Sequence, residues 1–339
     1  PFDAKQDPQT SSMAYFRQIT TSRNLSETAL ELIENAKAKG TRSCYRSAWN
    51  KFNGWCSGKQ INPTSCPVEN ILNYLSVLFE QGMKYRTINS HRSAISHFHN
   101  PIEGFKAGQH PTVCKLLKGI SRARPSQPRY TFIWDVEVVL KKMRELPANS
   151  KLPLSTLSFK LVTLLGLISP DRGSELIYFD INSMGTTPTQ YEFFLEGTVK
   201  HSKQGMTNPS IKYHAFQKET KLCPIETITI YLQRTKEYRQ RHNTTKLWLS
   251  YAPPHKPISK TTLTRWVTSM LAIGGVNTNR FKPHSLRAAS TSKGFQRGIS
   301  ISDILKRGNW SNESVWQTYY HKEISPTESY QRNLLDATN

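Results

Sequence analysis

The sequence has no run of about 18 apolar residues, so it offers no candidate for a membrane-spanning helix. Its first residues, PFDAKQDPQTSS, lack the apolar stretch of a secretory signal peptide, and we expect the protein to be intracellular. It has five cysteines and no CxxC pair, which argues against both a zinc site and a disulfide framework. We therefore expect reduced thiols, no metal and no membrane partner.

Acidic residues are few: the 339 residues include 46 Lys and Arg but 24 Asp and Glu, a formal net charge of +22. The excess is spread along the chain, with 18 basic and 8 acidic residues over 1–130 and 28 and 16 over 131–339. Such a distribution suits a protein that surrounds a polyanion, and it favours nucleic acid as the partner. A basic protein without such a partner would have the same charge.

The first part of the chain has the apolar periodicity of helices throughout. We expect an arm over residues 1–20 and then a helical DNA-binding domain over residues 21–120. Its predicted helices cover residues 25–39, 41–58, 67–82, 84–99 and 110–120.

The helix predicted over residues 84–99 carries side chains that suit contacts with DNA. Basic residues alternate there with Asn and Ser, a mixture typical of phosphate and base-edge contacts. The candidates are Lys84, Arg86, Asn89, His91 and Arg92. An exposed helix with ordinary solvated charge would show the same pattern.

Residues 121–131 are predicted to form a basic linker that contains proline. The stretch SRARPSQPRY has three arginines and no acid, so Arg122, Arg124 and Arg129 are further candidates for DNA contact. The length of the chain suggests two domains, and we expect the second over residues 132–339. Its predicted helices cover residues 134–146, 154–168, 224–240, 259–273 and a terminal stretch at 325–337.

The most informative stretch is PHSLRAASTSKGFQRGISISDILKRGNWSNESVWQTYY, residues 283–320. His284 and Arg287 lie three residues apart in a segment with helical periodicity, so both side chains would leave one helix face. Two such donors on one face can bind one phosphate. A basic helix that contacts DNA, followed by core aromatics, would explain the pattern without catalysis.

A second motif, SPDRGSEL, precedes it in the chain. We expect Ser169 to be the N-cap and Pro170 the first residue of a helix, with Arg172 in its first turn and Glu175 one turn later. A guanidinium there offers a fixed fork to phosphate oxygens, and the carboxylate can orient it. An ordinary helix salt bridge has the same RxxE spacing.

Alternating periodicity predicts a small antiparallel sheet between these motifs, with strands over 176–182, 191–200 and 209–216. Lys200 and Lys203 flank a turn in VKHSKQG, where a hairpin tip could carry an ammonium into a cleft. Most lysines on turns are simply exposed. The predicted class is mainly α with this small sheet: a helical domain followed by an α+β catalytic domain.

The motifs occur in one order: Arg-x-Ser-Glu-Leu, a hairpin lysine, His-x-Leu-Arg, then Trp and Tyr. In this order the chain resembles the tyrosine recombinases. YRSAWNKFNGWC, YRTINSHRSAIS and HSLRAASTSKG with ILKRGNWSNES further resemble the recombinases of DIRS-type and Ngaro-type retrotransposons. The likeness runs from Met13 to Ile324 and implies a core-binding and a catalytic domain that together clamp DNA.

The resemblance also implies a role for each motif residue. Arg172 and Arg287 would bind the scissile phosphate, and Glu175 would support the active-site arginines and histidine. Lys203 would be the general acid, with Lys200 as the alternative, and His284 would assist proton transfer. Trp310 occupies a position where many members have His and some have Trp, and its indole N–H would donate to a phosphate oxygen. No cofactor or metal is implied.

Two tyrosines compete for the role of nucleophile. The spacing in Cre-like enzymes, nine residues after the His or Trp, selects Tyr319, while that of the retroelement recombinases, ten residues after, selects Tyr320. The local match of TYYHKEI to the retroelement pattern favours Tyr320. Before the first arginine many members have Thr-Gly-x-Arg, whereas this chain has Ser-Pro-Asp-Arg, which places Asp171 beside Arg172.

The resemblance implies cleavage and rejoining of double-stranded DNA through a 3′-phosphotyrosyl link and a Holliday junction, within a homotetramer. For a retrotransposon we expect integration of a circular DNA copy in the nucleus. A domesticated DNA-binding protein without catalysis, a type IB topoisomerase and a packaging protein that reads only charge are the alternatives.

Overall fold

The computed structural model describes residues 25–170, 172–197, 199–200, 202 and 204–324. By its internal contacts the chain divides into two compact units, residues 1–127 and 128–339. The predicted terminal helix at 325–337, the arm at 1–20, Asp171 and Lys203 all lie outside the described residues.

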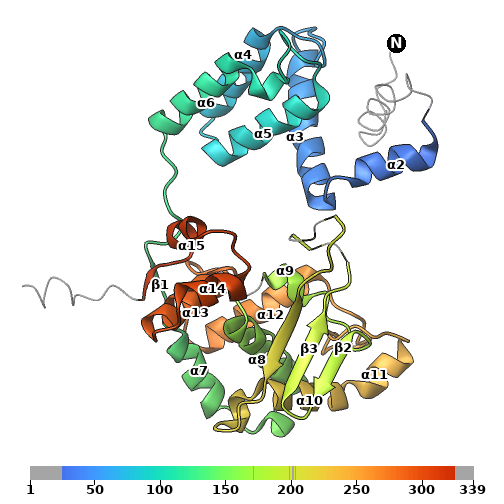
Figure 1. The fold of residues 1–339 in the computed structure, drawn as a ribbon, viewed down its shortest axis with the longest axis vertical. Helices are drawn as coiled ribbons and strands as arrows, with labels where there is room; N and C mark the ends of the chain where they lie inside the picture. The colour runs from blue at the N-terminus through green and yellow to red at the C-terminus, as the bar shows by residue number, and fades with distance from the viewer. Residues whose placement is uncertain (1–24, 171, 198, 201, 203, 325–339) are drawn as a thin grey trace, which may run out of the picture. The chain divides into compact units, whose positions relative to one another are not determined.

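The first unit is helical in all of its described part (Figure 1). Its helices are α2 (Glu27–Asn35), α3 (Lys39–Ser57), α4 (Val68–Glu80), α5 (Tyr85–Phe98) and α6 (Pro111–Ala123). Helices α3 to α6 share a core that includes Trp49, Phe52, Leu75, Ile88 and Val113, all of them buried. Because their apolar residues recur at helical spacing, each helix presents one apolar stripe to this core.

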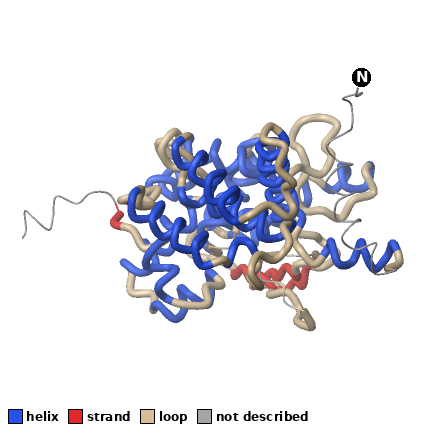
Figure 2. Tube along the Cα trace, turned by 90° about the horizontal axis from the view of Figure 1, so that it is seen from above, coloured by secondary structure: helices blue, strands red, loops and turns tan. Residues whose placement is uncertain are grey.

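The second unit consists mainly of helices with two small sheets (Figure 2). Its α-helices are α7 (Val136–Glu145), α8 (Leu154–Ile168), α9 (Gly173–Leu176), α10 (Pro224–Arg234), α11 (Lys236–Arg241), α12 (Lys260–Ile273), α13 (Ser285–Gln296), α14 (Ile301–Gly308) and α15 (Glu313–Tyr319). In the described residues of both units, no helix is long and apolar enough to cross a membrane.

The larger sheet is antiparallel, in the order β2 (Met184–Thr187), β3 (Gln190–Phe194) and β4 (Ser210–His214). Phe193 of β3 and Tyr213 of β4 are both buried, and Phe193 stacks on Phe179 with ring centroids 4.1 Å apart. The smaller sheet is parallel and joins β1 (Phe132–Ile133) to β5 (Glu323–Ile324). The two ends of the described part of the second unit therefore meet.

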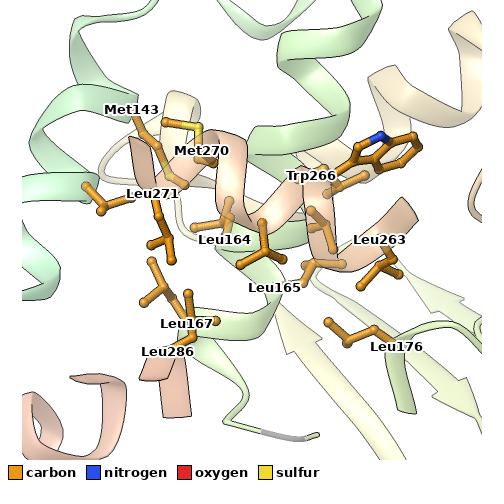
Figure 3. Close-up of a cluster of buried hydrophobic side chains, with 14 of the residues drawn as sticks. Met143, Leu164, Leu165, Leu167, Leu176, Leu263, Trp266, Met270, Leu271 and Leu286 are labelled. Atoms are coloured by element: carbon orange, nitrogen blue, oxygen red, sulfur yellow. The ribbon is translucent and has the colours of Figure 1, made fainter. Parts of the chain in front are cut away.

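Helix α8 is the central element of the second unit. It is apolar around most of its circumference, and Figure 3 shows its Leu164 and Leu165 beside Trp266 and Met270 of α12. A helix that is apolar on all sides can be buried on all sides, which fixes the elements packed around it. Gly166 allows close approach of α13, since an added Cβ would lie 2.6 Å from a methyl carbon of Leu286.

The predicted fold class is confirmed: the chain is mainly helical with a small antiparallel sheet. Three local predictions were wrong. Residues 176–182 are not a strand, because Leu176 ends α9 and Phe179 turns into the core, and the first strand of the sheet is β2. Ser169 ends α8 and does not begin the next helix. The helix predicted over 224–240 is interrupted at Thr235.

Candidate active site

His284 and Arg287 lie at the start of α13, as the HxxR spacing predicts. His284 is the N-cap residue and Arg287 lies in the first turn. Arg287 is buried, with 2% of the residue exposed, and its Nη2 donates to the carbonyl oxygen of Gly308 at 2.6 Å. The last residue of α14 therefore fixes the position of this guanidinium.

Trp310 is brought to Arg287 by the turn that ends α14. Asn309 adopts the left-handed conformation at φ 51°, and its backbone N–H bonds to the last turn of the helix. The chain then reverses, and the Trp310 ring lies 4.3 Å from the Arg287 guanidinium carbon. At Gly308, an added Cβ would lie 1.8 Å from Cζ3 of Trp310, so this approach requires glycine.

Tyr320 follows the last residue of α15 and lies against the same group. Its phenol oxygen is 3.3 Å from Nε2 of His284. Its ring centroid is 4.7 Å from that of Trp310 and 5.0 Å from the Arg287 guanidinium carbon. Tyr319, the competing candidate, is 59% exposed. The structure thus brings Tyr320 together with His284, Arg287 and Trp310.

Arg172 and Glu175 form the start of α9, but in a different way from the predicted one. Arg172 is the N-cap residue, and its backbone N–H donates to Glu175 Oε2 at 3.0 Å. The two side chains also form an ion pair, with 3.4 Å between Nη1 and Oε1. Because Glu175 is 5% exposed, its carboxylate can hold both the backbone and the guanidinium of Arg172.

The environment of His284 is strongly positive. Burial lowers its pKa below the ordinary value, and the charges of Arg287, Arg129, Arg172 and Lys200 lower it further. His284 is therefore neutral at pH 7, with a ring nitrogen that can accept a proton. All four cations are close enough to His284 to influence its charge, and such a set of charges favours an anionic group nearby.

Lys200 is exposed and close enough to influence His284, while its competitor Lys203 is outside the described residues. The choice between the two lysines as general acid therefore stays as the sequence left it. Among the described residues, no group of three or more His, Cys, Asp and Glu side chains could hold a metal ion.

A cavity of about 750 Å³ shares one catalytic candidate, Glu175, with this group. Its lining mixes apolar side chains with polar and charged ones, and Asn309 also forms part of its wall. Neither His284, Arg287, Trp310 nor Tyr320 lines it. These four candidates therefore lie outside the cavity.

Of the predicted DNA contacts, Lys84, Arg86, Arg122 and Arg129 have exposed side chains. Partly buried Asn89 accepts two hydrogen bonds from Arg92, at 3.1 and 2.7 Å, which fixes both side chains on α5.

Two of the predicted DNA contacts have partners inside the first unit. His91 is 6% exposed, and its Nδ1 lies 2.8 Å from the Tyr74 hydroxyl oxygen, so the position suits packing and not contact with DNA. Arg124 donates to the carbonyl oxygens of Phe79 and Met83 at 3.1 and 2.9 Å. It therefore caps the C-terminal end of α4.

The sequence did not single out Gly308. It named Lys200 as a candidate but did not indicate that its charge would lower the pKa of His284. The Gly-Asn pair before Trp310 was a signal for the turn, since Gly and Asn are the residues that commonly end helices. The position of the Gly308 carbonyl relative to Arg287 depends on tertiary packing, which has no local signature.

Comparisons with known proteins identify one matching family and one relative. Residues 157–325 match the phage integrase family. An integrase/recombinase xerD homolog of Selenomonas ruminantium is 23% identical over 333 residues, which cover 94% of this chain and 91% of that protein.

Two solved structures share the fold. The XerH site-specific recombinase, in a post-cleavage complex with palindromic difH substrate, has a TM-score of 0.60 at 13% identity, covering 99% of this chain and 98% of its own. The Tn1549 transposon integrase, in complex with circular intermediate DNA, has a TM-score of 0.53 at 11% identity, covering 95% and 98%. Residues 157–325 therefore match the phage integrase family, and the chain shares the fold of these two recombinase and integrase structures.

Proposed function

We propose that this protein cuts and rejoins double-stranded DNA, with Tyr320 as the nucleophile. The observation that carries the proposal is the position of the Tyr320 phenol, 3.3 Å from His284 and beside the Arg287 guanidinium. A phenol has a pKa near 10, so it needs a base and a cationic environment to become nucleophilic at pH 7. Both are present around Tyr320.

In the proposed reaction, the Tyr320 oxygen attacks the scissile phosphorus while its proton passes to Nε2 of His284. The bond between phosphorus and the 5′ oxygen breaks, and Lys203 protonates the departing oxygen. Arg172, Arg287 and the Trp310 indole N–H stabilise the charge on the pentavalent phosphate. The 5′-hydroxyl of a partner duplex then attacks the phosphotyrosyl link, which restores the tyrosine without ATP.

We further propose that the substrate is a circular DNA copy of a DIRS-type or Ngaro-type retrotransposon, integrated in the nucleus. The motif likeness to those recombinases supports this choice. Two rounds of exchange through a Holliday junction would require a homotetramer on DNA. The Tn1549 integrase, a transposon enzyme of the same fold, was solved with circular intermediate DNA, which is in keeping with such a substrate.

A suicide-substrate assay tests the proposal. Purified protein is mixed with nicked terminal-repeat DNA without divalent metal, and the products are separated on a denaturing gel. We expect a covalent protein–DNA band that Tyr320→Phe abolishes and Tyr319→Phe retains. The reverse result would assign the nucleophile to Tyr319.

The same preparation separates the alternative functions. Tight, salt-sensitive binding to terminal-repeat DNA with no covalent band would favour a DNA-binding protein without catalysis. Relaxation of supercoiled plasmids that lack terminal repeats would favour a topoisomerase.

A further inference from the structure

A single buried hydroxyl bonds to the backbone on both sides of His321, immediately after the proposed nucleophile. Ser292 of α13 is 2% exposed. Its hydroxyl donates to the carbonyl oxygen of Tyr320 at 3.1 Å and accepts the N–H of Lys322 at 3.0 Å. The hydroxyl thus has both a donor and an acceptor role with the same short segment.

The segment needs such a fixed point because Tyr320 lies where α15 ends. Its φ and ψ are −123° and −33°, and its N–H and that of His321 both donate to the Trp316 carbonyl oxygen, at 2.8 and 2.9 Å. Carbonyls at a helix end have no partner within the helix. Ser292 supplies one for Tyr320, and the backbone that carries the phenol is held at that point.

Neighbouring contacts position the residues that follow but act on other groups. The His321 ring stacks on Trp316 with centroids 4.7 Å apart, and Phe295 packs edge-on against it. Strand β5 pairs with β1 from residue 323 onward. These contacts secure the chain beyond Tyr320, while the Ser292 bond reaches the carbonyl of Tyr320 itself.

The same helix carries the phosphate-binding candidates. His284 caps α13, and Arg287 precedes Ser292 by five residues, which corresponds to a rise of about 7.5 Å along the helix. A helix of this length behaves as one rigid element. Ser292 therefore fixes the Tyr320 backbone to the body that also fixes Arg287 and His284.

We propose that Ser292 is a positioning residue that holds Tyr320 in line with the scissile phosphate. The inference rests on the proposed function, because it assumes that Tyr320 is the nucleophile. Attack on phosphorus is sensitive to small displacements of the attacking atom, and a shift of about 1 Å can cost up to about 100-fold in rate. Removing the hydroxyl should therefore affect cleavage more than binding.

Ser290→Ala is the matched control for Ser292→Ala. Ser290 lies on the same helix, and its hydroxyl also donates to a backbone carbonyl, that of Leu167. Both variants remove one oxygen and one bond to a backbone carbonyl from α13, and Ser292→Ala also removes the acceptor of the Lys322 N–H, so we expect both to lower the melting temperature. They differ in the segment that loses its bond to α13. Ser290→Ala frees a carbonyl of α8, whereas Ser292→Ala frees the backbone of residues 320–322.

The measurements are single-turnover cleavage at saturating DNA and the Kd for DNA, made on the full chain. We expect Ser292→Ala to cleave about 10-fold more slowly with an unchanged Kd, and Ser290→Ala to cleave at the original rate. Hydrogen exchange should show lost protection of the Lys322 amide in Ser292→Ala and retained protection in Ser290→Ala.

A substrate with a 5′-bridging phosphorothiolate shows on which side of the reaction Ser292 acts, because its sulfur leaves without protonation. The Ser292→Ala defect should persist with it, as expected for a misplaced nucleophile. Full recovery would place Ser292 on the leaving-group side, and equal rates for the two variants would show a role in stability alone; either result overturns the inference. Failure of the unsubstituted protein to form a covalent product would instead contradict the proposed function, and the inference with it.

Discussion

The phenol oxygen of Tyr320 lies 3.3 Å from Nε2 of His284, and the two rings meet edge to face at 5.7 Å between centroids. Burial and the surrounding cations keep His284 neutral at pH 7. A neutral imidazole can accept the phenol proton, whereas an imidazolium cannot. The protonation state of His284 should therefore control formation of the nucleophile.

This relationship predicts a specific pH dependence of cleavage. The pKa of His284 is lowered from 6.5, so the fraction of neutral imidazole should stay high between pH 8 and 6.5 and decrease only at lower pH. We expect single-turnover rates to decline on the acidic side below pH 6.5, and His284→Asn to reduce the rate by about 100-fold or more. A decline that already begins between pH 8 and 7 would contradict this assignment.

Glu175→Gln should weaken both stability and cleavage. The change removes the charge that pairs with Arg172 at 3.4 Å in a largely buried site. Because breaking a buried pair leaves a charge uncompensated, we expect a decrease of about 3 kcal/mol in the free energy of unfolding and about 10-fold slower cleavage. Glu145→Gln is the control, since its pair with Lys142 is exposed and should contribute less than about 1 kcal/mol. Equal decreases in stability and in cleavage rate for the two variants would contradict a role of Glu175 in holding Arg172.

Gly308→Ala should disrupt the contact between Arg287 and Trp310. The new methyl carbon would lie 1.8 Å from the Trp310 ring, so the ring has to move. We expect a loss of about 1–3 kcal/mol in unfolding free energy and strongly reduced cleavage. Gly119→Ala in α6, where an added Cβ meets nothing within 4 Å, should instead stabilise the protein by about 0.5–1 kcal/mol. Denaturant unfolding of both variants distinguishes packing from helix propensity.

Stability should fall as the pH is lowered from 7 to 5. His91, His97, His99, His284 and His321 all have pKa values below 6.5 in the folded protein, with burial as the largest cause. Between the folded and unfolded pKa values the unfolded chain binds more protons, so the free energy of unfolding rises with pH in that window. Denaturant midpoints at pH 5, 6 and 7 measure this, and a midpoint that increases toward pH 5 would contradict the lowered values.

Arg122 and Arg124 should respond differently to alanine, although they are two residues apart. Arg122 is exposed, so Arg122→Ala should weaken DNA binding and reduce the slope of log K against log salt by about 1, with little effect on stability. Arg124 bonds to two carbonyls at the end of α4 and lies over the Phe79 ring at 4.2 Å. Arg124→Ala should therefore cost about 1–2 kcal/mol of stability. Identical salt slopes in the two variants and in the unsubstituted protein would remove Arg122 from the DNA contacts.

Sequence patterns were most informative where periodicity was strong. Helix α8 begins and ends at the predicted residues 154 and 168, because its apolar run has clear limits. The segment at 176–182 was misread, since LIYFDIN looks like a strand but its apolar residues serve the end of α9 and a turn into the core. Short apolar runs do not distinguish these outcomes, which depend on tertiary contacts.

In the candidate site, too, motifs could be predicted from the sequence, whereas contacts between distant residues could not. The order of motifs selected His284, Arg287, Trp310 and Tyr320, which the structure brings within contact. Composition alone could not separate His91 from the exposed basic residues of α5, because its partner Tyr74 lies on another helix. The Ser292 bonds were likewise invisible, since they join residues about 30 positions apart.

The parallel pairing of β1 with β5 has a mechanical consequence. Strand β5 begins three residues after Tyr320, and β1 is the first strand after the linker. A DNA strand attached to Tyr320 would therefore pull on α13 through Ser292, and through β5 on residues 132 and 133, of which Ile133 is buried in the core. Tension along the bound DNA would thus be shared between α13 and the first strand of the second unit, both of which pack in its core.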